Sequence, residues 1–136
     1  MPDDANSIYE INIDGTGITK LTKDDNRAIL SNPVWSPDGT KIAYVSNTKT
    51  VDELTFVDLF DPKSNLMMLD PVKGNSCTVL NSPDSLESYP FWSADGTKLF
   101  FTTTYDNFTS IYSVDATCDT TDVPVHILPF DLPFDF

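Results

Sequence analysis

Apolar and polar positions follow the same order in two stretches of the chain. The stretches cover residues 33–46 and 90–103, and both read Pro, an apolar residue, Trp-Ser, a turn ending in Asp-Gly-Thr-Lys, and a short apolar run. Trp35 and Trp92 lie 57 residues apart, as do Asp38 and Asp95, so the two stretches align without a gap. An internal repeat of this length predicts a stacked or radial architecture of similar units.

Each copy contains a turn signal. In the first copy Pro37 presets φ at about −65°, Asp38 can bond to the local backbone, and Gly39 accepts a positive φ. The second copy has Ala94 where the first has proline, and alanine can adopt the same φ. A glycine at the end of such a turn suits a hairpin closed by a β-bulge. The sequence therefore predicts an antiparallel hairpin in each copy.

The strand after each turn is apolar on both faces. Residues 42–45 and 99–101 place apolar side chains on both sides of the strand. Such a strand is covered on both sides, which in an antiparallel hairpin calls for sheets packed face to face. Residues 53–60 fit either a strand or a short helical turn. Further alternating or apolar stretches predict strands at 7–13, 18–22, 34–35, 41–46, 65–70, 77–80, 110–115 and 123–128.

These elements divide the all-β chain into repeated four-stranded units. We expect two complete units, with the outer two strands of a third unit ahead of them. The expected segments are a polar N-terminal segment at 1–6, the half unit at 7–22, a unit at 33–81 with an insertion at 47–64, a unit at 90–128, and a tail rich in Pro and Phe at 129–136.

The repeated pattern resembles a known family. It reads Ile-Tyr-x-x-x-x-Asp-Gly, then Leu-Thr, then Pro-x-Trp-Ser-x-Asp-Gly-Thr-Lys, and over residues 7–128 it is similar to the TolB-type, WD-like β-propeller repeat. The resemblance implies antiparallel four-stranded blades. Within the first full blade it implies an innermost strand at 34–35, a second strand at 42–45, and an outer pair at 65–69 and 78–80.

Two and a half blades do not close a ring, because propellers typically have about 4–8 blades. We therefore expect an incomplete propeller, either the C-terminal portion of a larger one or a shortened form of one, whose half blade has its inner strands upstream. Open blade faces would expose more apolar area than soluble monomers usually show. Self-association through those faces is the expected consequence.

The composition of the chain argues against two classes of binding partner. The chain has 136 residues with 8 Lys and Arg against 21 Asp and Glu, which gives a net charge of −13. Nucleic acid needs a basic footprint, and anionic membranes attract basic segments, so neither is an expected partner. No apolar run approaches the ~20 residues of a membrane span. We interpret the acidic surface as solvated, in preference to a docking face for a basic partner.

The expected compartment rests on the resemblance. Residues 1–6 are polar and have no signal-peptide core, which fits either a cytoplasmic protein or one whose leader has been removed. The TolB-like family implies a periplasmic or secreted protein.

The acidic residues of the repeats are the first candidates for chemistry. Asp38 and Asp95 are candidate catalytic carboxylates or calcium ligands, but their place in tight turns favours a structural role. Asp14 also lies in a turn, without the alternating ligand series of a calcium loop. His126 is the only histidine, and its strand alternation predicts a position facing solvent, opposite its neighbours. We expect no catalytic, cofactor-binding or metal-ligating residue.

Two cysteines and five aromatic residues complete the candidates. Cys77 and Cys118 occupy roughly equivalent loops of adjacent units, where they either form a disulfide across neighbouring blades or remain free thiols. The aromatic side chains are expected to pack between blades rather than to form a ligand-stacking platform. The tail at 129–136 should be extended because of its prolines, and either docks over an open blade face or serves as a peptide motif. The aromatic residues are Trp35, Tyr44, Trp92, Phe100 and Phe101.

The expected function is that of a non-catalytic protein-interaction scaffold of TolB type, with protein partners and no cofactor. One alternative is the gating propeller of a prolyl oligopeptidase-type serine peptidase, whose catalytic domain would lie outside this chain. A second alternative is a carbohydrate-binding or carbohydrate-active propeller. Membrane insertion is not expected.

Overall fold

The structure is a computed structural model that describes residues 7–22, 29–47, 64–82, 86–105, 108–119 and 123–127. Within these ranges it has ten strands and no helix. The predicted segments 1–6 and 129–136 and the alternatives at 53–60 lie outside the described residues. The predicted insertion at 47–64 also lies outside the described residues, except for its end residues 47 and 64. The strands are β1 Tyr9–Glu10, β2 Thr19–Lys20, β3 Ile29–Trp35, β4 Ile42–Asn47, β5 Ser64–Asp70, β6 Asn75–Ser82, β7 Leu86–Trp92, β8 Lys98–Tyr105, β9 Phe108–Asp115 and β10 Val125–His126.

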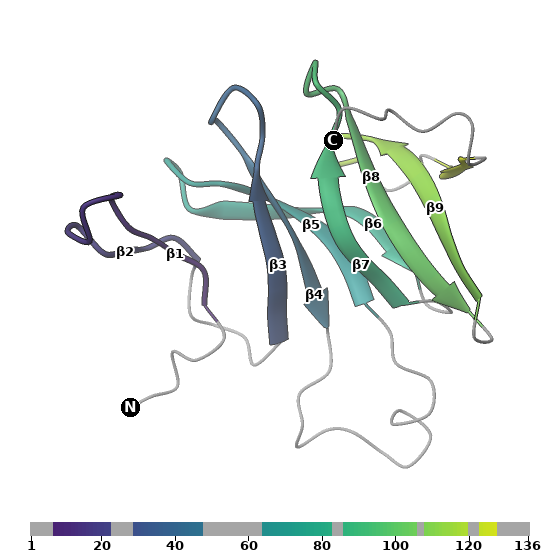
Figure 1. Cartoon of the computed structure of the whole chain (residues 1–136), viewed down its shortest axis with the longest axis horizontal. Coiled ribbons are helices and arrows are strands. Elements are labelled where there is room, and N and C mark those ends of the chain that lie inside the picture. Colours follow the sequence, from purple (N-terminus) through teal and green to yellow (C-terminus); the bar gives the residue numbers. More distant parts are fainter. Residues whose placement is uncertain are drawn as a thin grey trace, which may run out of the picture.

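The strands form three antiparallel sheets in which each strand pairs with the next along the chain (Figure 1). The first blade has the order β3-β4-β5-β6, and the second blade has the order β10-β9-β8-β7. Ahead of them β1 and β2 pair only with each other among the described residues, and we call them the outer pair. The prediction of an all-β protein built from antiparallel four-stranded sheets is confirmed.

The sheets are stacked, with the first blade between the outer pair and the second blade (Figure 1). One core cluster joins the two blades and includes Ala43 and Leu66 from the first and Leu99 and Phe101 from the second. The other cluster joins the first blade to the outer pair. Strand β4 contributes to both clusters, and its residues 42–45 are all buried. The prediction that this strand is covered on both faces is therefore confirmed.

The first strand of each blade is longer than predicted and contains a bulge. The register of β3 against β4 shifts just before residue 34, and that of β7 against β8 shifts just before residue 91. Asn32 and Tyr89, at equivalent positions, have positive φ values of 56° and 52°. The bulge was expected at the glycine of the turn, but it lies at Asn32 and Pro33 in β3 and at Tyr89 and Pro90 in β7. A proline cannot donate to a ladder and is found at edges and bulges.

The outer pair is shorter than predicted. Strands were expected at 7–13 and 18–22, yet β1 and β2 have two residues each. Ile8 and Leu21 are buried against the first blade, whereas Ile11, Ile13 and Ile18 are exposed. Only the base of this hairpin meets another sheet, so only there does packing support the ladder. Within the described residues, no helix has the length and hydrophobicity needed to cross a membrane.

Candidate functional site

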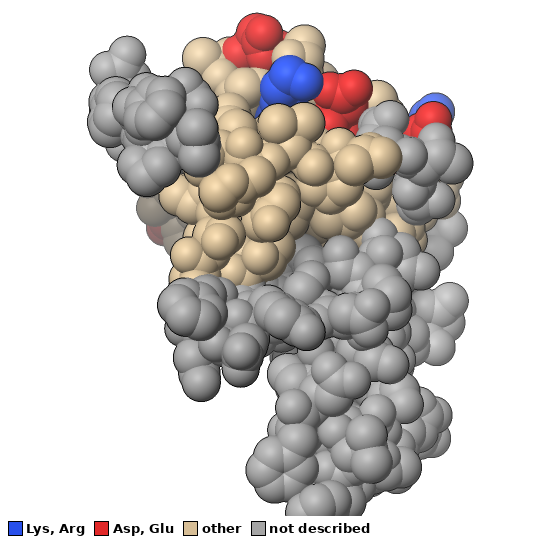
Figure 2. Space-filling model, turned by 90° about the vertical axis from the view of Figure 1, so that its right-hand side faces the viewer, with Lys and Arg blue, Asp and Glu red and all other residues tan. Residues whose placement is uncertain are grey.

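The β3–β4 and β7–β8 turns stand at the same end of adjacent blades (Figure 1). Residues of both turns line a cleft. The cleft has a volume of about 340 Å³. Its polar lining includes Asp38, Lys41 and Asp95 from the two turns, and its apolar lining includes Met68 of β5 and Trp92 of β7. Figure 2 shows that the charged side chains of the described residues on the face in view gather at this end. We take this cleft as the candidate site.

Both turns are held by the same hydrogen bonds. In the first turn Gly39 N donates to Ser36 O at 2.9 Å, and Thr40 N and Thr40 Oγ1 donate to Asp38 Oδ1 at 3.0 and 2.8 Å. Ser36 Oγ also donates to Asp38 Oδ1 at 2.7 Å, while it accepts from Lys41 N at 3.0 Å. The prediction that Asp38 bonds to its local backbone is confirmed.

The second turn repeats this arrangement although Ala94 replaces proline. Asp95 Oδ1 accepts from Thr97 N at 3.0 Å and from Thr97 Oγ1 and Ser93 Oγ at 2.7 Å each. Gly39 and Gly96 have φ values of 75° and 74°, which only glycine adopts without strain. The turn therefore depends on the serine, aspartate, glycine and threonine, and not on the proline.

These hydrogen bonds set the ionisation of the two acids. The Ser36 hydroxyl, followed by the donors of Thr40, lowers the pKa of Asp38 from 3.8 to about 2. The Thr97 hydroxyl has the largest effect on Asp95, whose pKa is also lowered to about 2. Both side chains are exposed, and both are ionised at neutral pH. A carboxyl group in this state is poorly matched to proton transfer near pH 7.

A lysine–aspartate ion pair recurs in each blade, and Lys41 of the first pair also lines the cleft. Lys41 Nζ lies 3.3 Å from Asp70 Oδ2, and Lys98 Nζ lies 2.7 Å from Asp115 Oδ1. Asp70 also accepts from the backbone of Lys73, which together with Lys41 lowers the pKa of its carboxyl. Each pair links the start of the second strand to the end of the third. These ion pairs were not predicted from the sequence, although the lysine and the aspartate recur in both units.

The two repeat tryptophans lie in different surroundings. Trp92 packs against the core cluster between the blades, and its Nε1 donates to Val34 O at 3.1 Å. Trp35 is 46% exposed, so the prediction that it packs between blades is wrong. The reason is that the outer pair covers only part of the face on which Trp35 lies, since the described residues include no inner strands for that unit.

Tyr44 and Phe101 pack between sheets as predicted, whereas Phe100 is buried but belongs to neither core cluster among the described residues. Phe101 and Tyr44 lie in the two core clusters, and Phe100 stacks on Phe91 with ring centroids 5.1 Å apart. The Tyr44 hydroxyl donates to Ser76 Oγ at 2.8 Å, and burial raises the pKa of Tyr44. Tyr44 and Phe101 are therefore part of the packing between sheets, and Phe100 packs on a neighbouring strand of its own sheet.

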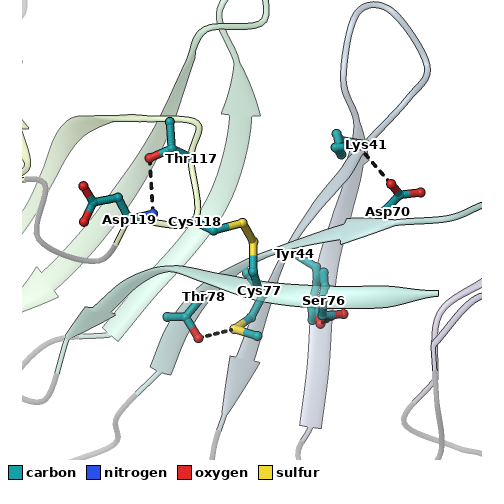
Figure 3. Close-up of a disulfide and its surroundings, with 10 residues drawn as sticks. Lys41, Tyr44, Asp70, Ser76, Cys77, Thr78, Thr117, Cys118 and Asp119 are labelled. Carbon is teal, nitrogen blue, oxygen red and sulfur yellow. Dashed lines mark hydrogen bonds and ion pairs between the residues drawn. A yellow bond between two sulfur atoms is a disulfide. The ribbon is translucent and has the colours of Figure 1, made fainter. Parts of the chain in front are cut away.

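A disulfide joins the blades (Figure 3). Cys77 and Cys118 are bonded, with their Cα atoms 5.6 Å apart. Both were placed in loops, but Cys77 lies within β6, and only Cys118 lies in the segment after β9. Of the two alternatives left open by the sequence, the structure has the disulfide. It ties the outer strand of the first blade to the second blade.

His126 lies apart from the cleft, on β10. It is exposed, as predicted, and its ring packs 5.1 Å from that of Tyr112. Its neighbour Val125 is also 60% exposed, so the expected burial of the opposite side of this strand is wrong for that residue. Within the described residues, no group of three or more His, Cys, Asp or Glu side chains is arranged to hold a metal ion.

The sheet order, the repeated turns and the stacking define the class of protein, which is a β-propeller represented here by two blades and an outer pair. No protein-family model and no curated protein matches the chain. Solved structures do, and they identify the fold as TolB-like.

Three solved structures illustrate the match. TolB from Acinetobacter baumannii superposes with a TM-score of 0.65 and 19% identity over 93% of this chain. An oligogalacturonate lyase from Vibrio parahaemolyticus has a TM-score of 0.64 and 17% identity over 98% of this chain. A Bacteroides ovatus protein described as a dipeptidyl aminopeptidase IV has a TM-score of 0.53 and 12% identity over 82%. The chain spans 28%, 33% and 22% of these structures, respectively.

Proposed function

We propose that the chain is part of a β-propeller that acts as a non-catalytic protein-interaction module of TolB type. The observation that supports this proposal is the state of the polar groups in the two turns and at the strand ends beside them. The repeated aspartates Asp38 and Asp95 hold their turns, and the lysines Lys41 and Lys98 pair with aspartates at the ends of neighbouring strands. Groups fixed in this way suit the recognition of a partner better than proton transfer.

The cleft also suggests what part of a partner enters it. A volume of about 340 Å³ lies at the small end of the range for binding pockets and suits one or two side chains. Trp92 and Met68 supply an apolar and aromatic lining, and Asp38 and Asp95 supply negative charge at the turns. The positive charge of Lys41, which also lines the cleft, is paired with Asp70. A net charge of −13 would also attract a basic partner from a distance. The proposal thus takes the alternative that the sequence alone placed second to a solvated surface, because two aspartates line one cleft. The proposed ligand is therefore a basic side chain of a protein partner.

We further propose a periplasmic or secreted location. The disulfide between Cys77 and Cys118 supports this location, because disulfides persist in oxidising compartments and are rare in the cytosol.

The function is tested by titrating the full chain with two capped pentapeptides, Gly-Arg-Leu-Arg-Gly and the same peptide with glutamine in place of arginine. We expect the arginine peptide to bind in calorimetry and to shift the indole N–H resonance of Trp92. Binding should weaken between about 0.05 and 0.5 M salt, because charge attraction is screened. The double variant Asp38→Asn, Asp95→Asn should bind less well, since it removes the negative charge.

Asp14→Asn is the matched control for that variant. Asp14 makes the same type of turn with Thr16 as the other two aspartates make with their threonines, but it lies on the outer pair. It should leave binding unchanged. Equal binding of the arginine and glutamine peptides, or no binding of either, would contradict the proposal. Binding of neutral oligosaccharides at the same resonances would instead favour the carbohydrate alternative.

A further inference from the structure

The disulfide lies next to residues that line the cleft. In the first blade Cys77 is the ladder partner of Met68, so the two side chains lie on the same face of the sheet. Met68 lines the cleft. In the second blade Cys118 follows shortly after Ala116, which also lines the cleft. The bond therefore ties the part of the lining that the first blade supplies to a part that the second blade supplies.

The segment after β9 carries this part of the second blade's lining. Ala116 N donates to Thr97 O at 2.9 Å, which fixes the start of the segment against the β7–β8 turn. Thr117 N donates to Asp115 O at 2.9 Å, and Asp119 N donates to Thr117 Oγ1 at 3.3 Å. These hydrogen bonds all lie within the second blade. The disulfide is the covalent link from this segment to the first blade (Figure 3).

The two half-cystines differ in exposure. Cys118 is exposed, whereas Cys77 is half-buried within β6 and packs against the core cluster between the blades. The rate of thiol–disulfide exchange depends on access to the attacked sulfur, and exposed disulfides are the more readily reduced ones. A reducing thiol therefore attacks the sulfur of Cys118, and Cys77 is the leaving group.

We propose that this disulfide is a redox switch that sets the affinity of the cleft, and that a dithiol operates it. The inference rests on the proposed function, because it concerns the binding of a basic side chain in the same cleft. With the bond formed, Met68 and Ala116 are held together around the ligand. With the bond reduced, the segment that carries Ala116 is released from the first blade, and binding weakens. In an oxidising compartment the high-affinity form is the resting state.

The exchange proceeds in two steps. A thiolate of the dithiol attacks Cys118 Sγ, so that a mixed disulfide forms there and Cys77 leaves as a thiolate. The second thiolate of the dithiol then attacks the reductant's own sulfur in the mixed disulfide, and Cys118 leaves as a thiolate. Both cysteines take up the protons that the dithiol has lost. The dithiol is oxidised to a disulfide, and two electrons pass to the protein.

A dithiol is needed because Cys77 stays close to the mixed disulfide. Strand β6 pairs with β5 at this residue, and the Cα atoms of the two cysteines lie 5.6 Å apart. The effective concentration of the Cys77 thiolate at the mixed disulfide is therefore high, and it displaces a monothiol and restores the bond. The second thiol of a dithiol competes with this return because its attack is also intramolecular.

The test compares binding of the peptide Gly-Arg-Leu-Arg-Gly to the full chain before and after anaerobic reduction with dithiothreitol. We expect the reduced chain to bind roughly 5- to 10-fold less well, at the lower end of the usual coupling between two sites. The variant Cys77→Ser, Cys118→Ser should bind like the reduced chain and should not respond to dithiothreitol. Ile8→Ala is the control for stability, because it removes a buried side chain from the other core cluster. It should bind as tightly as the oxidised wild type.

Reciprocity supplies a second measurement. The coupling between two sites acts equally in both directions, so a saturating amount of the arginine peptide should shift the disulfide equilibrium toward the oxidised chain by the same factor. The equilibrium is set with a buffer of reduced and oxidised dithiothreitol, and alkylation followed by mass spectrometry gives the ratio of the two forms. The glutamine peptide should leave that ratio unchanged.

The order of exchange is tested with glutathione, a monothiol. The reaction is quenched with acid and the chain is mapped by mass spectrometry. The adduct should be found on Cys118 and the free thiol on Cys77. An adduct on Cys77 would overturn the assignment of Cys118 as the residue that is attacked.

The remaining outcomes separate this inference from the proposed function. Equal affinities of the oxidised and reduced chains would overturn the switch and leave the proposed function standing, whereas no binding by the oxidised chain would overturn both. If Ile8→Ala binds as weakly as the reduced chain, lost stability causes the effect and the switch is wrong. Loss of the folded circular dichroism signal on reduction would also overturn it, since the bond would then hold the blades as a whole.

Discussion

The first and second blades contain the same hairpin with the same turn, but the tryptophans at equivalent positions lie in different surroundings. Trp92 has a neighbouring blade and donates to Val34 O, whereas Trp35 remains 46% exposed. Both turns have the same hydrogen bonds. The comparison separates two levels of structure, because the local motif determines the hairpin and the neighbouring sheet determines whether its tryptophan is buried.

The largest expected effect comes from truncating a buried side chain at the contact between the two blades. Phe101 is fully buried there, and Phe101→Ala should lower the free energy of unfolding by about 3–5 kcal/mol. Urea denaturation followed by circular dichroism measures this. Trp35→Ala, on the open face, should cost far less, and similar losses for both variants would show that the two faces do not differ as described.

Removing the disulfide should have the next largest effect. The bond closes a loop with a sequence separation of 41 residues, for which chain entropy suggests a stabilisation of about 2–4 kcal/mol. The double variant Cys77→Ser, Cys118→Ser should lose this amount in urea denaturation and should become insensitive to reductant. If the wild-type protein denatures at the same urea concentration with and without reductant, the blades are held together without this bond.

The direct comparison of the two tryptophans should give a smaller difference. Trp92→Phe removes a donor to Val34 O and should cost about 0.5–1.5 kcal/mol. Trp35→Phe, at an exposed position, should change stability by no more than about 0.5 kcal/mol. Equal losses in urea denaturation would mean that Trp35 contributes as much to folding as Trp92.

The smallest effect concerns the turns, which are alike in the two blades. The folded pKa of Asp38 and of Asp95 is lowered from 3.8 to about 2. Their stabilisation is therefore present above pH 3.8 and is lost as the pH falls through this range toward 2. The variant Asp38→Asn, Asp95→Asn should show a weaker decline of the denaturation midpoint between pH 5 and pH 2 than the wild type. If the midpoint of the double variant declines as much as that of the wild type, other groups cause the acid sensitivity. If the two turns are equivalent, either single variant should show half of the double variant's change in midpoint.

Much of the fold follows from short-range pattern. The Asp-Gly turns were predicted from Pro37, Asp38 and Gly39, because each of these residues restricts its own backbone or bonds within two or three positions. The double burial of β4 was predicted from apolar residues on both of its faces. The bulges at Asn32 and Tyr89 were placed wrongly, since positive φ at a residue other than glycine has no strong local signal.

The candidate site could be predicted only in part. Its aspartates were noticed as repeated acids, but the cleft between the turns depends on how two sheets pack. The ion pair of Lys41 with Asp70 joins residues on neighbouring strands, and the bond between Cys77 and Cys118 crosses from one blade to the other. No spacing along the chain specifies such contacts, so the disulfide remained one of two alternatives until the sheets were placed.

The amino-acid sequence by itself determined the repeated hairpins, their turns and the antiparallel, all-β character of the chain, because these depend on the conformational preferences of adjacent residues. The tertiary structure alone decided that Trp92 packs against the core cluster while Trp35 is 46% exposed, that Cys77 is bonded to Cys118, and that the two turns border a common cleft. Those outcomes depend on which sheet lies against which face, and identical local motifs therefore acquire different surroundings.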